Sequence, residues 1–114
     1  MPIVYKICDA EEWRTAARDG AYPGSADDLR DGFIHFSSRE QVAETLRRHF
    51  AGRSELVVVA FDDSDLGAAL RYEPSRGGDL FPHLYATLDT AMAAWVRPVT
   101  MGADGAPTPP DLSP

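Results

Sequence analysis

Cysteine is almost absent from this chain of 114 residues, in which Cys8 is the single example. One thiol cannot form an internal disulfide. No stretch combines a basic start, an apolar run and a small-residue cleavage site, so we expect a cytoplasmic protein. Long hydrophobic runs are also missing, because the longest, residues 56–61, falls far short of the ~20 residues that cross a bilayer. These absences predict a soluble protein with no membrane partner.

Positive charge is scarce as well. Eleven Lys and Arg residues accompany eighteen Asp and Glu residues, which gives a formal net charge of −7. Such a field repels phosphate backbones and argues against a nucleic-acid partner. It does not argue against a nucleotide, because a local cation acts over a few ångströms while salt screens charges beyond about 8 Å. The charge therefore favours a small-molecule ligand, and it leaves the oligomeric state open.

The pattern of the chain predicts a single α+β domain over residues 1–106. Strand-like segments at 3–7, 32–37, 55–61, 70–73, 80–86 and 94–101 surround two helices opened by capping boxes, at Asp9 with Glu12 and at Ser38 with Gln41. Residues 21–31 show no period and are predicted to form a surface loop. The tail, residues 107–114, holds four prolines and is predicted to be extended and loosely held.

A first candidate site lies where the second strand meets the second helix. Side chains alternate along a strand, so His35 and Ser37 share one face with Phe33. Ser38 follows at a helix start, whose free N–H groups favour an anion. These residues predict a place for a phosphate or a carboxylate. The alternative is that His35 is a hydrogen-bonded core residue and that the serines are helix caps.

A second candidate site lies in residues 80–86. If this segment is extended, Phe81, His83 and Tyr85 share one face, with the same parity as His35. Two segments that each present an aromatic ring and an imidazole are suited to enclose a flat aromatic ligand. The alternative is that His83 simply covers the core.

The glycine-containing turn before that segment is a further candidate. Arg76 stands beside Gly77 and Gly78, so a guanidinium and closely approaching backbone amides are available to an anion. The alternative is a plain turn, because the phosphate-loop and dinucleotide glycine patterns are both missing. The three histidines and Cys8 also lack the close spacing of metal ligands, so we expect no metal site.

Several blocks of the sequence together resemble a known family. The blocks are residues 4–7 with Trp13, residues 31–37, Gln41, residues 49–50, 72–73, 75–78 and 81–85. They are similar to a bacterial family catalogued only as a domain of unknown function, number nine hundred and fifty-two. The resemblance extends from residue 3 to about residue 105. It implies a fold like the catalytic domain of ADP-ribosyltransferases, with two packed antiparallel sheets that hold NAD in a cleft.

The resemblance also implies roles for individual residues. In the ADP-ribosyltransferase pattern an Arg or His on an early strand meets the dinucleotide, a following Ser or Tyr supports it, and a late Glu assists transfer. His35 looks like the first of these and Ser37 like the second. Glu73 is the candidate for the third, but it precedes Pro74 and no glutamate follows Tyr85. This departure weakens the case for protein ADP-ribosylation more than the case for nucleotide binding.

We therefore expect an ADP-ribosyltransferase-like enzyme that takes NAD or a related nucleotide as its substrate, with no resident cofactor identified. The catalytic candidates are His35, Glu73 and His83. The ligand-binding candidates are Tyr5, Ser37, Ser38, Arg76, Gly77, Gly78, Phe81 and Tyr85. Two alternatives stay open: a non-catalytic module that binds a metabolite or a peptide, and a histidine pair that acts as acid and base on a phosphodiester.

Overall fold

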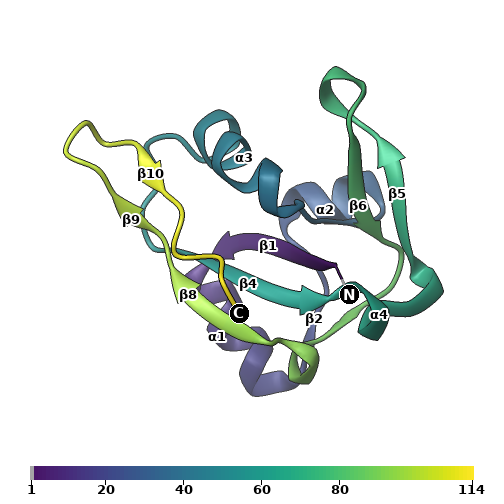
Figure 1. The fold of residues 1–114 in the computed structure, drawn as a ribbon. Coiled ribbons are helices and arrows are strands. Elements are labelled where there is room, and N and C mark those ends of the chain that lie inside the picture. Colours follow the sequence, from purple (N-terminus) through teal and green to yellow (C-terminus); the bar gives the residue numbers. More distant parts are fainter. Residues whose placement is uncertain (1) are drawn as a thin grey trace.

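Short helices and antiparallel strands alternate in the computed structural model, which describes residues 2–114 apart from the side chain of Arg76 (Figure 1). The helices are α1 (Ala10–Asp19), α2 (Ala26–Asp31), α3 (Val42–His49) and α4 (Asp63–Leu66). The strands are β1 (Ile3–Asp9), β2 (Ala21–Tyr22), β3 (Ile34–His35), β4 (Leu56–Asp62), β5 (Leu70–Pro74), β6 (Leu80–Leu84), β7 (Leu88–Asp89), β8 (Trp95–Pro98), β9 (Thr100–Met101) and β10 (Pro107–Thr108). The predicted compact α+β domain with antiparallel sheets is confirmed.

Two three-stranded antiparallel sheets form the framework, in the orders β1-β4-β8 and β3-β6-β5. β1 and β4 pair along their whole length, from Ile3 opposite Asp62 to Asp9 opposite Leu56. A single bridge between Tyr5 and Ser37, with both N–H···O distances 2.8 Å, joins the two sheets. β2 with β7 and β9 with β10 add two small pairs. The site described below lies on the β3-β6-β5 sheet, close to β1.

The β1-β4 pair is buried on both faces. On one face Val4, Cys8, Val59 and Phe61 pack against Trp13 of α1, and we call this group the first cluster. On the other face a second cluster contains Tyr5, Ile7, Leu56, Val58 and Ala60 together with Val42 and Leu46 of α3. α1 and α3 therefore cover opposite faces of this sheet (Figure 1). Burial on both faces explains the unbroken apolar run of residues 56–61.

The predicted loop over residues 21–31 is wrong, because this segment contains β2 and α2. α2 begins with a capping box, in which the Asp28 N–H donates to Ser25 Oγ at 3.2 Å and the Ser25 N–H donates to Asp28 Oδ2 at 2.9 Å. It ends at Gly32, which has a φ of 86°. A helix of six residues is too short to show an apolar period, so only the Ser-x-x-Asp cap indicated it.

The predicted strand over residues 32–37 is also too long. Gly32 closes α2 and Phe33 forms a bend, so that regular pairing is limited to β3 and the bridge at Ser37. The predicted final strand, residues 94–101, is divided into β8 and β9. Val99 separates them, and its N–H donates to the Leu56 carbonyl at 3.0 Å.

The expectation of a loosely held tail is wrong. β10 pairs with β9, and the Arg97 guanidinium donates to the carbonyls of Asp111 at 2.6 Å and Ser113 at 2.7 Å. Leu112 packs against the second cluster. The tail is extended, as its prolines require, but main-chain carbonyls and one apolar side chain attach it to the sheet.

Among the described residues no helix is long and apolar enough to span a membrane.

Candidate functional site

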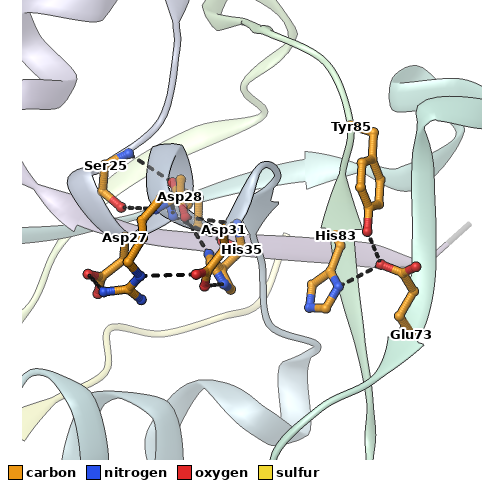
Figure 2. Close-up of polar contacts among 10 residues, drawn as sticks. Ser25, Asp27, Asp28, Asp31, His35, Glu73, His83 and Tyr85 are labelled. Carbon is orange, nitrogen blue, oxygen red and sulfur yellow. Dashed lines mark hydrogen bonds and ion pairs between the residues drawn. The ribbon is translucent and has the colours of Figure 1, made fainter.

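The structure brings the two predicted histidines together. His35 on β3 and His83 on β6 are directly opposite each other in the antiparallel register. Their ring centroids lie 5.6 Å apart and the rings are nearly perpendicular, at 72°. Figure 2 shows that each imidazole belongs to its own group of polar side chains, one from α2 and β3, the other from β5 and β6. The two candidate segments therefore form one site.

The His35 group is organised by Asp28 of α2. The Nδ1 atom of His35 lies 2.6 Å from Asp28 Oδ1, and the His35 backbone N–H donates to the same oxygen at 3.1 Å. Lys6 Nζ donates to Asp28 Oδ2 at 2.8 Å and to the His35 carbonyl at 3.1 Å. The side chains of Asp28 and Lys6 are buried, whereas that of His35 is 33% exposed. Asp28 therefore fixes the ring and leaves Nε2 as its outward-facing nitrogen.

These contacts determine the charge of Asp28. Burial by itself raises the pKa of this carboxyl, but the hydrogen bond from His35 and the charge and hydrogen bond of Lys6 outweigh it. The result is a pKa well below the ordinary range of an aspartate, so Asp28 is a carboxylate at neutral pH. A carboxylate accepts only, so Nδ1 of His35 carries the proton of that contact.

The His83 group is organised by Glu73 of β5. The Nδ1 atom of His83 lies 2.8 Å from Glu73 Oε1, and the Tyr85 hydroxyl donates to the same oxygen at 2.7 Å. The hydrogen bonds from Tyr85 and His83 lower the pKa of Glu73, and the same bond to Glu73 raises that of Tyr85. Arg71 lies over the Tyr85 ring, with its Cζ 5.0 Å from the centroid. Glu73, whose reach the sequence left open, thus contacts His83 directly.

Phe33 lies at the centre of the site. Its ring stacks on His83 at a centroid distance of 4.0 Å and an interplanar angle of 25°. The ring centroid also lies 4.6 Å from that of His35 and 5.3 Å from that of Tyr85. Phe33 is partly exposed, while the side chain of His83 beside it is only 6% exposed. Phe33 therefore takes part in covering His83.

A cleft of about 450 Å³ opens beside His35. His35 lines it, but His83 does not. Its other walls come from the start of α1, from α2 and from the end of α3, and they include the carboxylates Asp9, Glu12, Asp27, Asp28 and Asp31. The cations Lys6 and Arg30 are already paired with aspartates of this set. These carboxylates favour a cationic or hydroxyl-rich part of a ligand, whereas Arg53 and the ring of His35, which also line the cleft, are the groups that an anionic part would meet.

The predicted serines lie apart from the cleft. Ser37 is buried and its Oγ donates to Thr45 Oγ1 at 3.3 Å. Ser38 forms the capping box before α3, in which its N–H donates to Gln41 Oε1 at 2.9 Å. Neither serine lines the cleft. Ser38 is the helix cap that the alternative interpretation gave it, whereas Ser37 is a buried residue of the bridge to Tyr5.

The other predicted ligand-binding residues are placed differently from one another. Phe81 is buried on β6, two residues before His83. Gly77 and Gly78 form a turn between β5 and β6, outside the lining of the cleft, and the side chain of Arg76 lies outside the described residues. Tyr5 faces the second cluster and donates to the Leu112 carbonyl at 3.3 Å. The alternation of β1 thus places Tyr5 away from the histidines and Lys6 towards them.

Sequence reasoning missed Lys6, Asp28 and Asp31 as site residues. Two signals for them exist in the sequence. Lys6 lies on the same strand face as the apolar residues Val4 and Cys8, where an unpaired ammonium would be costly. The Ser25-x-x-Asp28 cap indicates a helix, and on a helix Asp28 and Asp31 are one turn apart and share a face.

The family model described as "Protein of unknown function (DUF952)" matches residues 7–96. The chain belongs to the DUF952 family. This match confirms the family resemblance of the sequence, and the description assigns no activity.

Solved structures similar to this DUF952 protein include those of the protein CC0527 of Caulobacter crescentus. Its crystal structure is 42% identical in sequence, with 93% of each chain covered and a TM-score of 0.89. Its solution NMR structure is 43% identical, with 94% of this chain and 92% of that chain covered and a TM-score of 0.85. Comparison with curated proteins finds no match.

Proposed function

We propose that this DUF952 protein binds a nucleotide, with NAD as the leading candidate, and cleaves the bond between its ribose and nicotinamide. Nicotinamide leaves with the bonding electron pair, and water or a nucleophile of a second substrate forms the new bond to the ribose carbon. The proposal adopts the ADP-ribosyltransferase-like fold that the family resemblance implies. The observation that supports it most is the pair of carboxylate-held imidazoles, with ring centroids 5.6 Å apart, beside the rings of Phe33 and Tyr85.

The chemistry of the site suits a cationic transition state. Cleavage of a bond between a sugar and a nicotinamide passes through an oxocarbenium-like state, which carboxylates and aromatic faces stabilise. Glu73 keeps its charge, because hydrogen bonds from Tyr85 and His83 lower its pKa. The carboxylates of the cleft add to the same negative potential. Glu73 is thus the catalytic carboxylate of the proposal, and His35 is the group that contacts the ribose or phosphate.

Two variants test this assignment. In His35→Ala the loss of the ligand contact is expected to abolish the thermal stabilisation that NAD gives to the unmodified protein. In Glu73→Gln, which keeps the shape and an acceptor oxygen, NAD should still bind, but nicotinamide release followed by mass spectrometry should fall about 10²- to 10³-fold. Tyr5→Phe, altered on the opposite face of β1, is the control and should match the unmodified protein. Undiminished stabilisation of His35→Ala by NAD would refute the binding role.

A second candidate is favoured by the orientation of the imidazoles. Each Nδ1 faces a carboxylate, which is how catalytic histidines are commonly oriented when Nε2 transfers a proton. In this case the protein would hydrolyse a phosphodiester bond, and the test substrate is a 2′,3′-cyclic mononucleotide. Hydrolysis of that probe with a bell-shaped pH profile, and no release of nicotinamide from NAD, would replace the first proposal with this one. Saturable NAD binding without any turnover would instead identify a non-catalytic binding module.

A further inference from the structure

The two residues that flank Gly32 contact the two imidazoles. Asp31, the last residue of α2, places Oδ2 at 3.0 Å from Nε2 of His35. Phe33 stacks on the ring of His83 at 4.0 Å. One short segment, residues 31–33, thus brings a carboxylate to one histidine and a planar ring to the other.

These contacts occupy the surfaces that a ligand would use. Nδ1 of His35 is held by Asp28, so Nε2 is the nitrogen left for a ligand, and Asp31 takes it. Nδ1 of His83 is held by Glu73, and Phe33 covers one face of the ring. Since one N–H donates well to one acceptor and one ring face stacks with one ring, a ligand that bonds Nε2 of His35 or stacks on this face of His83 has to replace these side chains.

Both side chains are placed so that they can withdraw. The side chain of Asp31 is 35% exposed, and its Oδ1 is also 3.1 Å from Nε of the exposed Arg30, a partner that remains when His35 is released. Phe33 is partly exposed and lies in the bend between α2 and β3, outside the paired strands. Neither belongs to the two buried hydrophobic clusters.

We infer that Asp31 and Phe33 occupy the positions of a ligand's anionic group and planar ring, and that the site takes a compound carrying both. This inference deepens the proposed function, because it narrows the ligand of the same histidine pair. In the absence of a ligand, Asp31 and Phe33 would block the two histidines, and we call residues 31–33 the plug. A nucleotide fits the class, and so does an aromatic carboxylate.

The experiment uses three small probes, namely nicotinate with a ring and a charge, nicotinamide with the ring alone, and acetate with the charge alone. Binding to the full chain is measured by calorimetry and by the ring resonances of His35 and His83. Removing a stacked ring by Phe33→Ala should tighten nicotinamide binding about 3- to 10-fold, because one aromatic pair no longer competes. Asp31→Ala should tighten acetate binding in the same way, and the double variant should gain most for nicotinate.

The controls are Tyr72→Ala, an aromatic residue of β5 that contacts Asp63 instead of the histidines, and Asp65→Ala in α4. Both should bind the probes as the unmodified protein does. Phe33→Leu repeats the test if Phe33→Ala fails to fold. Equal or weaker binding of nicotinamide by the folded Phe33 variants overturns the inference, because Phe33 would then be a wall of the site.

The outcome is separable from that of the proposed function. Nicotinate binding by the double variant, with no NAD binding or cleavage by any form, supports the plug and rejects NAD. NAD cleavage by the unmodified protein that is lost in Phe33→Leu, together with no gain for the small probes, keeps the proposed function and rejects the plug.

Discussion

At the scale of single residues, the buried Lys6–Asp28 pair needs a physical explanation. Taking two charges out of water costs several kcal/mol each, so such pairs persist only where their remaining groups are satisfied. Asp28 accepts from the Lys6 ammonium, from the ring and backbone of His35, and from the Ser25 N–H. Both oxygens of Asp28 therefore have hydrogen-bond donors. The ion pair connects β1, α2 and β3 beneath the exposed edge of His35.

Asp28→Asn should lower the free energy of unfolding by about 3 kcal/mol or more, because it leaves the Lys6 ammonium buried without its counter-charge. Urea denaturation measures the loss. Asp27→Asn, one residue away on the exposed face of α2, removes only a surface ion pair with Arg30 and should cost less than about 1 kcal/mol. Equal losses in the two variants would contradict the importance given to the buried pair.

The same variant should change the response to acid. The pKa of Asp28 is lower in the folded chain than in the unfolded chain, so its contribution is complete above the ordinary value of about 3.9 and is lost as the pH falls below it. Unmodified protein should therefore lose stability more steeply than Asp28→Asn does as the pH falls from about 5 through about 3.9 and below. Denaturation at a series of pH values gives the two slopes, and parallel curves would show that Asp28 is not the group responsible.

At the scale of elements, α2 decides where the site forms. This one helix carries Asp28, which orients His35, and Asp31, which faces its outer nitrogen. The helix has only six residues, so it owes its formation to its caps and to its packing more than to its own propensity. Its position beside β3 and β1 turns an ordinary strand histidine into one with carboxylates at both nitrogens.

Ser25→Ala should therefore weaken the site through the helix. Loss of the cap at the start of α2 is expected to lower the free energy of unfolding by about 1 kcal/mol. It should also speed amide exchange at Leu29 and Gly32, whose N–H groups donate to the carbonyls of Ser25 and Asp28. Asp62→Ala, which removes the side-chain cap of α4, should cost a similar amount and leave these two amides as they were. Unchanged exchange in Ser25→Ala would mean that packing alone holds α2.

At the scale of the whole molecule, the tail and the buried side chain of Lys6 lie on opposite faces of the β1-β4 pair. Leu112 and the Tyr5 hydroxyl meet on the face of the second cluster, while Lys6 and Cys8 face the other way. Burial raises the pKa of the Cys8 thiol to about 12, which makes it a structural residue of that interior. The tail is thus expected to contribute to stability without influencing the histidines.

Leu112→Ala should lower the free energy of unfolding by about 1 to 2 kcal/mol, since a half-buried leucine contributes part of the ~1.5–3 kcal/mol of full burial. NAD binding and the ring resonances of His35 and His83 should not change. Leu29→Ala, where the leucine is 65% exposed, is the matched control and should cost less than about 0.5 kcal/mol. A shift of the histidine resonances in Leu112→Ala would show that the two faces are coupled.

The sequence by itself determined what depends on neighbours along the chain. The caps at Asp9 and Ser38, the apolar strand of residues 56–61 and the common face of His83 and Tyr85 follow from local hydrogen bonding and alternation. The sequence blocks were also sufficient to identify the family. They did not predict α2, because its six residues are too few for an apolar period to appear.

Only the tertiary structure decided which segments meet. The register that sets His35 opposite His83, the meeting of Lys6 with Asp28 and the stacking of Phe33 on His83 join residues far apart in the chain. Such contacts depend on how the sheets and α2 pack, and a one-residue change of register would turn each side chain to the other face. The local pattern therefore fixes the faces of the strands, and packing selects the partners that those faces meet.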